Sequence, residues 1–204
     1  MYKTLSSGLL GSNTYIVWDE RSREAMIIDC GNYPRTVLGE VEARALKVKY
    51  IVLTHAHYDH AEFVLEYKRT FVCSELIAHE CEVAVMNDPE ANVTALFGAP
   101  KTYGYPDKTV REGDEICLGN SKYRVLHTPG HTPGCICLYN EEERLMFTGD
   151  TLFECSRGRT DFKFGCEEDM RASLCRLFRM APEITFLSGH GGPSTIGREA
   201  ERVY

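Results

Sequence analysis

Short apolar runs bounded by turn residues recur along the whole chain. Runs of four to eight such residues are typical of buried strands, whereas helices show longer periodic segments. The first clear run covers residues 15–18, and a polar turn separates it from a second run that ends in Ile28 and Asp29. This pattern predicts strands over 15–18, 24–29, 49–53, 76–78, 115–118, 122–127, 135–139, 144–148 and 183–187.

Between and after these strands, apolar residues return at helical spacing. Val37, Leu38 and Val41 share one side of a helix that Pro34 can begin, because proline is well tolerated in the first turn. The pattern predicts helices over 34–47, 61–67, 80–86 and 167–180, and a short helix from about residue 193. The segment 87–108 carries three prolines and two glycines, and it is predicted to be a long loop of a kind that often serves function.

The predicted strands form two groups, each followed by helices, with no linker rich in Pro, Ser or Gly between them. A sheet must bury an apolar face, so two groups of strands favour two sheets packed face to face with helices outside. We therefore expect an α/β (α+β) protein that forms one domain over residues 1–204.

Composition excludes several function classes. The chain has 23 Lys and Arg against 30 Asp and Glu, a formal net charge of −7, which argues against a basic surface for nucleic acid. We also expect no membrane span and no signal peptide, because no apolar run is long enough for the first and the N-terminus lacks the pattern of the second. The nine cysteines are scattered, so we expect no zinc ribbon, and we expect buried thiols in a reducing cytoplasm.

Candidate chemistry begins where the predicted strand 49–53 ends. His55, His57, Asp59 and His60 fall within six residues, just before a predicted helix. Residues two apart at a strand end point the same way, so His55 and His57 can converge on one ion. Asp59 and His60 turn with the start of the helix and face a second position nearby. Imidazole nitrogen together with carboxylate oxygen suits zinc, iron or manganese.

Three further candidates, His131, Asp150 and His190, share one local context. Each follows the end of a predicted strand and adjoins a glycine. Glycine lets the backbone turn sharply and present the neighbouring side chain. Together with the first four residues, these three supply enough ligands for two ions.

These residues resemble the metallo-β-lactamase fold superfamily and, within it, the short glyoxalase II-like (hydroxyacylglutathione hydrolase-like) hydrolases. The resemblance rests on the HxHxDH run at 55–60, TPGHTPG at 128–134, SRGRTDF at 156–162 and GHGGPST at 189–195. It spans nearly the whole chain. It implies a four-layer αββα sandwich with the site at one edge, between the sheets.

The resemblance also implies ligand roles and a reaction. It assigns ligands to a first metal, to a second metal and to a bridge between them: His55, His57 and His131; Asp59, His60 and His190; and Asp150. Two divalent ions, zinc foremost with iron or manganese as alternatives, would hold a water as hydroxide that attacks a small-molecule thioester or ester. Asp59 and Asp150 are the expected catalytic carboxylates.

Other expectations concern the surroundings of the site. Full-length glyoxalase II carries a C-terminal helical extension that contributes to glutathione binding, and we expect none here because the sequence ends at Tyr204. Arg159 is expected either to bind a substrate carboxylate or to form an ion pair with Asp161. Cys155 is a candidate thiol at the mouth of the site, and His127 is a candidate for orienting a ligand.

Two alternative functions remain open. A persulfide dioxygenase-like oxidoreductase has the same fold and would use one iron, held most simply by His55, His131 and Asp150. A non-enzymatic metal-binding module is the other alternative, although every ligand position is filled. The cysteine content and the lack of an export signal argue against a β-lactamase.

Overall fold

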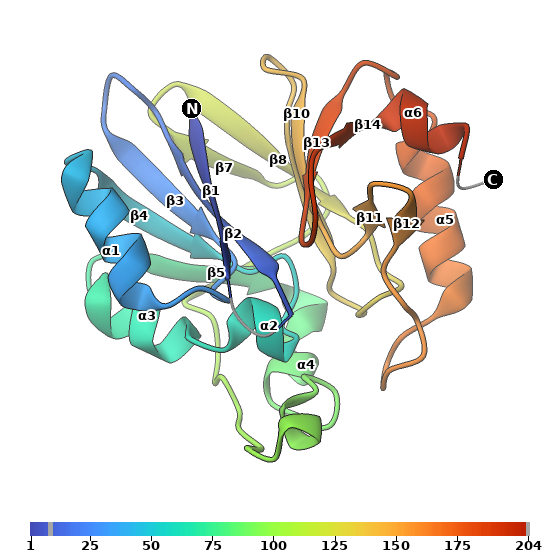
Figure 1. Cartoon of the computed structure of the whole chain (residues 1–204), viewed down its shortest axis with the longest axis horizontal. Coiled ribbons are helices and arrows are strands. Elements are labelled where there is room, and N and C mark those ends of the chain that lie inside the picture. Colours follow the sequence, from blue (N-terminus) through green and yellow to red (C-terminus); the bar gives the residue numbers. More distant parts are fainter. Residues whose placement is uncertain (8–9, 203–204) are drawn as a thin grey trace.

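Two six-stranded sheets form the centre of the computed structural model, which describes residues 1–7 and 10–202 (Figure 1). The first sheet has the order β1-β2-β3-β4-β5-β6: β1 (Tyr2–Ser7), β2 (Ser12–Trp18), β3 (Glu24–Ile28), β4 (Lys47–Val52), β5 (Glu75–His79) and β6 (Lys108–Val110). The second has the order β14-β13-β10-β9-β8-β7: β7 (Glu115–Leu118), β8 (Ser121–His127), β9 (Ile136–Asn140), β10 (Leu145–Gly149), β13 (Thr185–Ser188) and β14 (Ser194–Thr195). A small hairpin follows β10: β11 (Leu152–Phe153) and β12 (Ser156–Arg157).

Strand direction explains where the helices lie. The strands β1, β2 and β3 are antiparallel, whereas β3 to β6 are parallel. Parallel neighbours need crossover connections, and α1 (Pro34–Ala43), α2 (Tyr58–Ala61) and α3 (Val64–Thr70) lie in them. In the second sheet β10 and β13 are parallel, and α5 (Glu167–Leu177) lies in the chain between them. The short helix α6 (Ile196–Ala200) follows β14.

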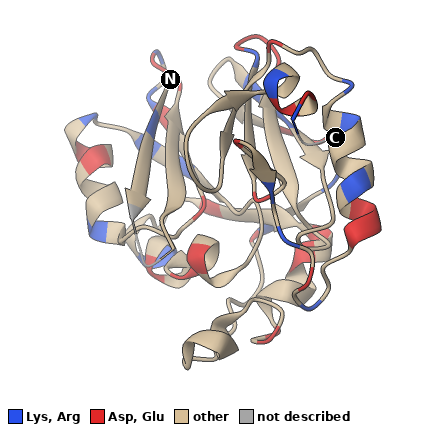
Figure 2. Cartoon of the chain, turned by 45° about the vertical axis from the view of Figure 1, so that its right-hand side comes forward, with Lys and Arg blue, Asp and Glu red and all other residues tan. Residues whose placement is uncertain are grey.

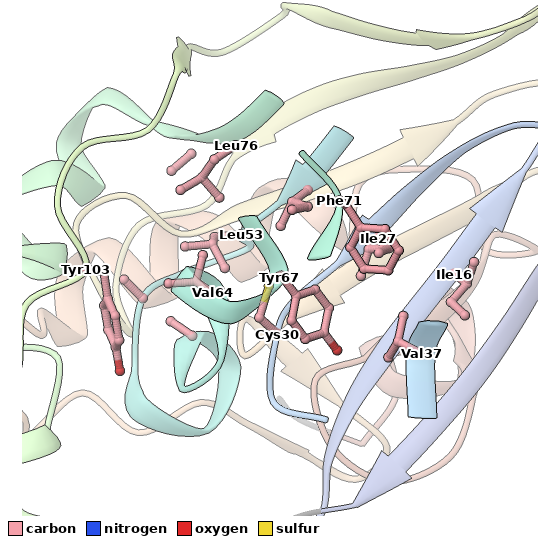
Figure 3. Close-up of a cluster of buried hydrophobic side chains, with 14 of the residues drawn as sticks. Ile16, Ile27, Cys30, Val37, Leu53, Val64, Tyr67, Phe71, Leu76 and Tyr103 are labelled. Atoms are coloured by element: carbon pink, nitrogen blue, oxygen red, sulfur yellow. The ribbon is translucent and has the colours of Figure 1, made fainter. Parts of the chain in front are cut away.

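Alternate residues of each central strand pack into different apolar layers. Tyr15 in β2 belongs to the cluster between the two sheets, whereas its neighbour Ile16 belongs to the outer cluster beneath α1 and α3. Figure 3 shows this outer cluster, in which Tyr67 of α3 lies near Cys30. A third cluster joins the second sheet to α5 through residues such as Leu174. Three apolar layers therefore separate four layers of structure, and the predicted αββα sandwich is confirmed.

Charge along α5 agrees with its direction. The helix begins with Glu167, Glu168 and Asp169 and carries Arg171 and Arg176 further along (Figure 2). Acidic side chains near the start of a helix and basic ones near its end complement the helix dipole. With 11 residues it is the longest helix in the described part of the chain, and none of the described helices combines the length and apolarity that crossing a membrane requires.

The predicted elements are mostly present, but several bounds were wrong. The helix expected over 61–67 is two helices, because α2 already begins at Tyr58 inside the histidine run. The expected helix 80–86 is a 3₁₀ turn (Glu80–Glu82) followed by α4 (Val83–Met86). The predicted loop 87–108 contains a 3₁₀ turn (Thr94–Phe97) and ends in β6. Strand β1 was missed because its sequence is largely polar, and pairing with β2 defines it.

The expectation that the cysteines are mostly buried was wrong. Only Cys30, Cys135 and Cys137 are buried, and Cys166 is partly exposed. The exposed ones are Cys73, Cys81, Cys117, Cys155 and Cys175. A neighbouring apolar residue in the sequence does not bury a thiol, because successive side chains of a strand or loop point in different directions. No disulfide joins any two of the nine, all of which lie among the described residues.

Replacement of Phe147 tests whether packing between the sheets stabilises the fold. Phe147 is 1% exposed, and its ring centroid lies 5.1 Å from that of Tyr15 on the opposite sheet. Phe147→Ala is expected to lower the free energy of unfolding by about 3–5 kcal/mol, measured by urea denaturation. Tyr105→Ala is the control, because Tyr105 is 79% exposed, and it should change stability by less than about 0.5 kcal/mol. Equal losses in both variants would contradict this view of the core.

Candidate metal centre

The seven predicted ligands meet at one edge of the sandwich. His55 and His57 follow β4, and Asp59 and His60 lie in the first turn of α2. The other three follow strands of the second sheet: His131 after β8, Asp150 after β10 and His190 after β13. Both sheets therefore contribute side chains to one cluster, as the sequence predicts.

Contacts from β2 fix the two sheets to each other at this edge. The Asn13 backbone N–H donates to the Gly189 carbonyl at 2.7 Å, and its side-chain amide donates to the Ser188 carbonyl at 2.9 Å. The Tyr15 hydroxyl donates to the same Ser188 carbonyl at 2.6 Å. The residues just before His190 are thus held against the first sheet, which also carries the candidate ligands after β4.

The glycines beside the candidate ligands serve two different purposes, of which the sequence predicted only the sharp turn. Gly149 has a φ of 48°, in the left-handed region that favours glycine. Gly189 needs no such angle. A Cβ atom there would lie 2.0 Å from Asp150 Oδ1, so any side chain would collide with the candidate ligand.

Within the described residues, candidate donor atoms form three overlapping groups, each with all atoms within 4.8 Å of one another. The groups are His55, His57 and His131; His55, His60 and Asp150; and Asp59, His60 and His190. The first and last groups match the two predicted ligand sets, and the middle group connects them.

Asp150 faces both sets of ligands. Its Oδ1 lies 3.2 Å from His60 Nε2, on the side of the second set. Its Oδ2 lies 3.5 Å from His131 Nε2 and 3.6 Å from His190 Nε2, so one oxygen is near both sets. This is the arrangement expected of a carboxylate that bridges two ions.

Several buried polar atoms of the cluster have no hydrogen-bond partner among the described residues. They are Nε2 of His55, Nε2 of His57 and Oδ1 of Asp150. Burying a polar atom without a partner is costly, and native proteins rarely leave such atoms unsatisfied. A cation coordinated by these lone pairs would remove the cost. Nitrogen and carboxylate donors at these spacings therefore fit divalent metal ions.

Electrostatics within the cluster also favour a cation. Burial holds the pKa of His55 well below its usual range and lowers that of His57 to about 3, so both imidazoles are neutral and have a lone pair to donate. Burial alone would lower the pKa of His60, but the carboxylates of Asp150 and Asp59 hold it well above the usual range. Burial alone would likewise raise the pKa of Asp150, which His60 holds well below its ordinary value. A proton on His60 therefore compensates the negative charge of Asp150 and Asp59, and a bound metal ion could compensate that charge instead.

Asp29 is not one of the candidate donors, but it orients His60 through a hydrogen bond, and the sequence analysis missed it. It is 1% exposed and follows β3 with a φ of 62°. Its carboxylate accepts from the Thr54 backbone N–H at 2.7 Å and from the Thr54 hydroxyl at 2.8 Å. His60 Nδ1 lies 2.8 Å away and must donate, because a carboxylate only accepts, and this leaves Nε2 for the cluster. The signal was an aspartate just after an apolar strand, the same context as Asp150.

The loop after β12 orients the candidate ligand His131 through its main chain. His131 Nδ1 donates to the Arg159 carbonyl at 2.7 Å, which turns Nε2 toward the cluster. The Arg159 side chain makes two 2.6 Å contacts with Asp161 and lies 4.2 Å from the ring centre of Phe162. The expected ion pair between Arg159 and Asp161 is present.

Glu82 connects the two loops that carry the first ligand set, and it was also missed. It is fully buried, and its Oε1 accepts from the Ala56 backbone N–H at 2.7 Å, between His55 and His57. Its Oε2 accepts from the Thr132 hydroxyl at 2.7 Å and the Gly134 N–H at 2.9 Å, beside His131. Burial raises the pKa of Glu82 to about 7, although the three donors oppose the shift.

The remaining candidates lie outside the cluster. His127 stacks on His79 with ring centroids 3.9 Å apart, and its Nε2 lies 2.8 Å from the Pro133 carbonyl instead of bonding a ligand. The suggested role of His127 in orienting a ligand was therefore wrong. Cys155 is exposed and is not among the residues that line the pocket beside the cluster.

Comparison with known proteins identifies the class to which this fold and donor set belong. The family model of the metallo-β-lactamase superfamily matches residues 7–190. An uncharacterized protein of Aquifex aeolicus is 36% identical over 198 residues, 97% of this chain and 92% of its own. Hydroxyacylglutathione hydrolase GloC of Haemophilus influenzae is 33% identical over 191 residues, 92% of this chain and 89% of its own. The chain belongs to the metallo-β-lactamase superfamily, a superfamily of metallo-hydrolases.

Two solved structures have the same architecture over nearly their full length. BLEG-1, a B3 metallo-β-lactamase, is 31% identical with a TM-score of 0.90, and the match covers 98% of this chain and 97% of BLEG-1. TTHA1623, solved in a di-iron-bound form, is 31% identical with a TM-score of 0.86 over 98% of each chain. The predicted fold family is thereby confirmed.

Glu82 gives the stability of the protein a specific pH dependence. Its pKa is about 7 in the folded chain against an ordinary value of 4.5. The folded state thus binds a proton more tightly, so the contribution of Glu82 to stability is complete below pH 4.5 and is lost as the pH rises through 7. Measured by urea unfolding, the stability of the wild type relative to Glu82→Gln should fall by up to about 3 kcal/mol from pH 4.5 to pH 8. A difference that stays constant with pH would rule out the shift.

Proposed function

We propose that the protein is a hydrolase that uses two divalent metal ions to cleave a small-molecule thioester or a related ester. The proposed ligands are His55, His57 and His131 for the first ion, Asp59, His60 and His190 for the second, and Asp150 for both. The position of Asp150, with oxygens facing both sets, is the observation that carries this proposal. The name of the GloC relative supports thioester chemistry, and the di-iron form of TTHA1623 supports two ions.

The chain's own residues prepare the centre in three ways. Asp29 and the Arg159 carbonyl fix the tautomers of His60 and His131, so that their Nε2 atoms face the cluster. Burial keeps His55 and His57 neutral. The ions held there would supply a Lewis acid and lower the pKa of a water, which is the chemistry that ester and thioester hydrolysis needs.

The proposed reaction needs neither a nucleophilic side chain nor a strong general acid from the protein. A thiolate is a weakly basic leaving group and departs with little help from a proton donor. Asp59 and Asp150 are the proposed catalytic carboxylates because they hold the reactive centre. Contact of Arg159 with substrate stays a prediction, as does the choice of zinc over iron or manganese.

Substitution of Asp150 tests the bridge. Asp150→Asn keeps the shape of the side chain but removes the charge that serves both ions. Elemental analysis should give about two metal ions per wild-type chain, and the variant should lose most of both together with at least about 10²-fold in kcat. Asp169→Asn, an exposed carboxylate of α5, is the control and should keep wild-type metal content and rate. Retention of both ions and full activity in Asp150→Asn would make the bridging assignment wrong.

Three assays on the metal-loaded protein separate the proposed reaction from its alternatives. A thioester hydrolase releases thiol from an acyl-thiol at a rate that metal removal abolishes. A mono-iron persulfide dioxygenase would instead contain one iron and consume oxygen with glutathione persulfide. Because BLEG-1 is named a β-lactamase, cleavage of a cephalosporin is the third assay. Activity only in the second or third assay would reject the proposed reaction.

A further inference from the structure

The pocket beside the metal centre has apolar walls. It is a cavity of about 420 Å³, a size typical of small-molecule sites, and the candidate ligands His57, Asp59, His131, Asp150 and His190 form its floor. Its walls are formed largely by apolar side chains: Leu10, Val93, Leu96, Phe97, Phe153 and Phe162. Leu96 is 69% exposed and Phe97 38% exposed, so this part of the wall presents apolar surface to the cavity.

The only cationic side chains on the described walls already have partners within the chain. Arg157 donates to Glu167 through both terminal nitrogens, at 3.0 and 2.9 Å. Arg159 makes its paired contacts with Asp161 and lies over Phe162. A substrate carboxylate would therefore have to compete with a carboxylate of the protein itself, whereas an uncharged group meets no such competition.

The apolar wall from the loop 87–108 is held in place by polar contacts. Asn92 is fully buried, and its side chain accepts from the Thr94 backbone N–H at 3.0 Å and donates to the Lys101 carbonyl at 2.9 Å. The backbone carbonyl of Asn92 accepts a hydrogen bond from the backbone N–H of Tyr58, the residue before Asp59, at 2.9 Å. Val93 follows with a φ of 59°, a strained conformation for a β-branched residue. Strain of this kind persists only where the surroundings enforce it, and here it places an apolar side chain on the pocket wall.

We infer that the site selects thioesters or esters with an uncharged apolar group, aliphatic or aromatic, beside the scissile bond. The inference rests on the proposed hydrolase function and adds the substrate class. Water adds to the acyl carbon, the bond from that carbon to sulfur or oxygen breaks, and the products are a carboxylic acid and a thiol or alcohol. The apolar group, whether on the acyl or the leaving side, contacts Val93, Leu96 and Phe162. A peptide-like thiol such as glutathione instead brings carboxylates, and both cationic side chains on the described walls are already in ion pairs.

Two series of thioesters test the inference. The acyl series is acetyl, butanoyl, hexanoyl and succinyl N-acetylcysteamine, and the thiol series is the acetyl thioesters of ethanethiol, hexanethiol and glutathione. Burial of one methylene corresponds to roughly a fourfold gain. We expect kcat/KM to rise at least about tenfold from acetyl to hexanoyl, or from ethanethiol to hexanethiol, and the series that rises identifies which side enters the pocket. Butanoyl should exceed succinyl, its carboxylate-bearing counterpart of the same chain length.

A pair of variants connects the preference to the pocket wall. Leu96→Ser should lower the ratio of long-chain to short-chain kcat/KM several-fold. Val72→Ser is the matched control, because Val72 is 77% exposed and lies outside the pocket, and it should keep the wild-type ratio. Both side chains are exposed, so neither change is expected to prevent folding.

The outcomes separate this inference from the proposed function. Metal-dependent hydrolysis without chain-length preference in either series, or with preference for succinyl or glutathione thioesters, would overturn the inference and leave the hydrolase proposal standing. An unchanged ratio in Leu96→Ser would also overturn it. No metal-dependent hydrolysis of any member of either series would reject the proposed function itself.

Discussion

The buried donor atoms at one edge of the sandwich carry negative charge and lone pairs that need a positive charge among them, and this requirement constrains the rest of this structure. Buried imidazoles and the buried carboxylate of Asp150 converge there, and several of their atoms have no partner among the described residues. Such a cluster is stable only if a positive charge sits among the donors, whether a proton on His60 or metal ions. A proton on an imidazole joins one nitrogen to one acceptor, whereas a metal ion can bind several donor atoms at once. The arrangement therefore favours metal ions. Asp29, Glu82 and the Arg159 carbonyl hold the candidate ligands or their loops in place through hydrogen bonds.

The fold supplies this edge by bringing the ends of strands together. His55 and His57 follow β4 of the first sheet, whereas Asp150 and His190 follow the parallel pair β10 and β13 of the second. The apolar layer between the sheets keeps the two halves packed, and hydrogen bonds from Asn13 to Ser188 and Gly189 join them at the site. Binding residues on rigid strand ends can be held in place, while the surrounding loops are free to shape the pocket. In this chain those loops present mainly apolar side chains to the pocket, so the residues that would select a substrate are different from those of the metal centre.

Much of the site could be predicted because its signals are local. The run from His55 to His60 places four donors on one strand-to-helix turn, and a glycine marks each of the other three ligands. Asp29 had a similar signal and was overlooked, whereas Glu82 had none, since a glutamate in a helical segment is ordinarily solvated. The error over the cysteines shows the limit of such local signals: Cys73, Cys117 and Cys175 adjoin apolar residues in the sequence and are nevertheless exposed.

The sequence by itself determined most of the central strands, the two-sheet class and the identity of the candidate ligands, because hydrophobic periodicity and short motifs are properties of neighbouring residues. Only the tertiary structure shows which candidate donors lie together, since that depends on residues more than a hundred positions apart, such as His60 and His190. It also decided that Arg157 and Arg159 are paired within the chain and that the pocket walls are apolar. Those facts depend on how loops pack around the sheet edge, and local pattern carries no information about such contacts.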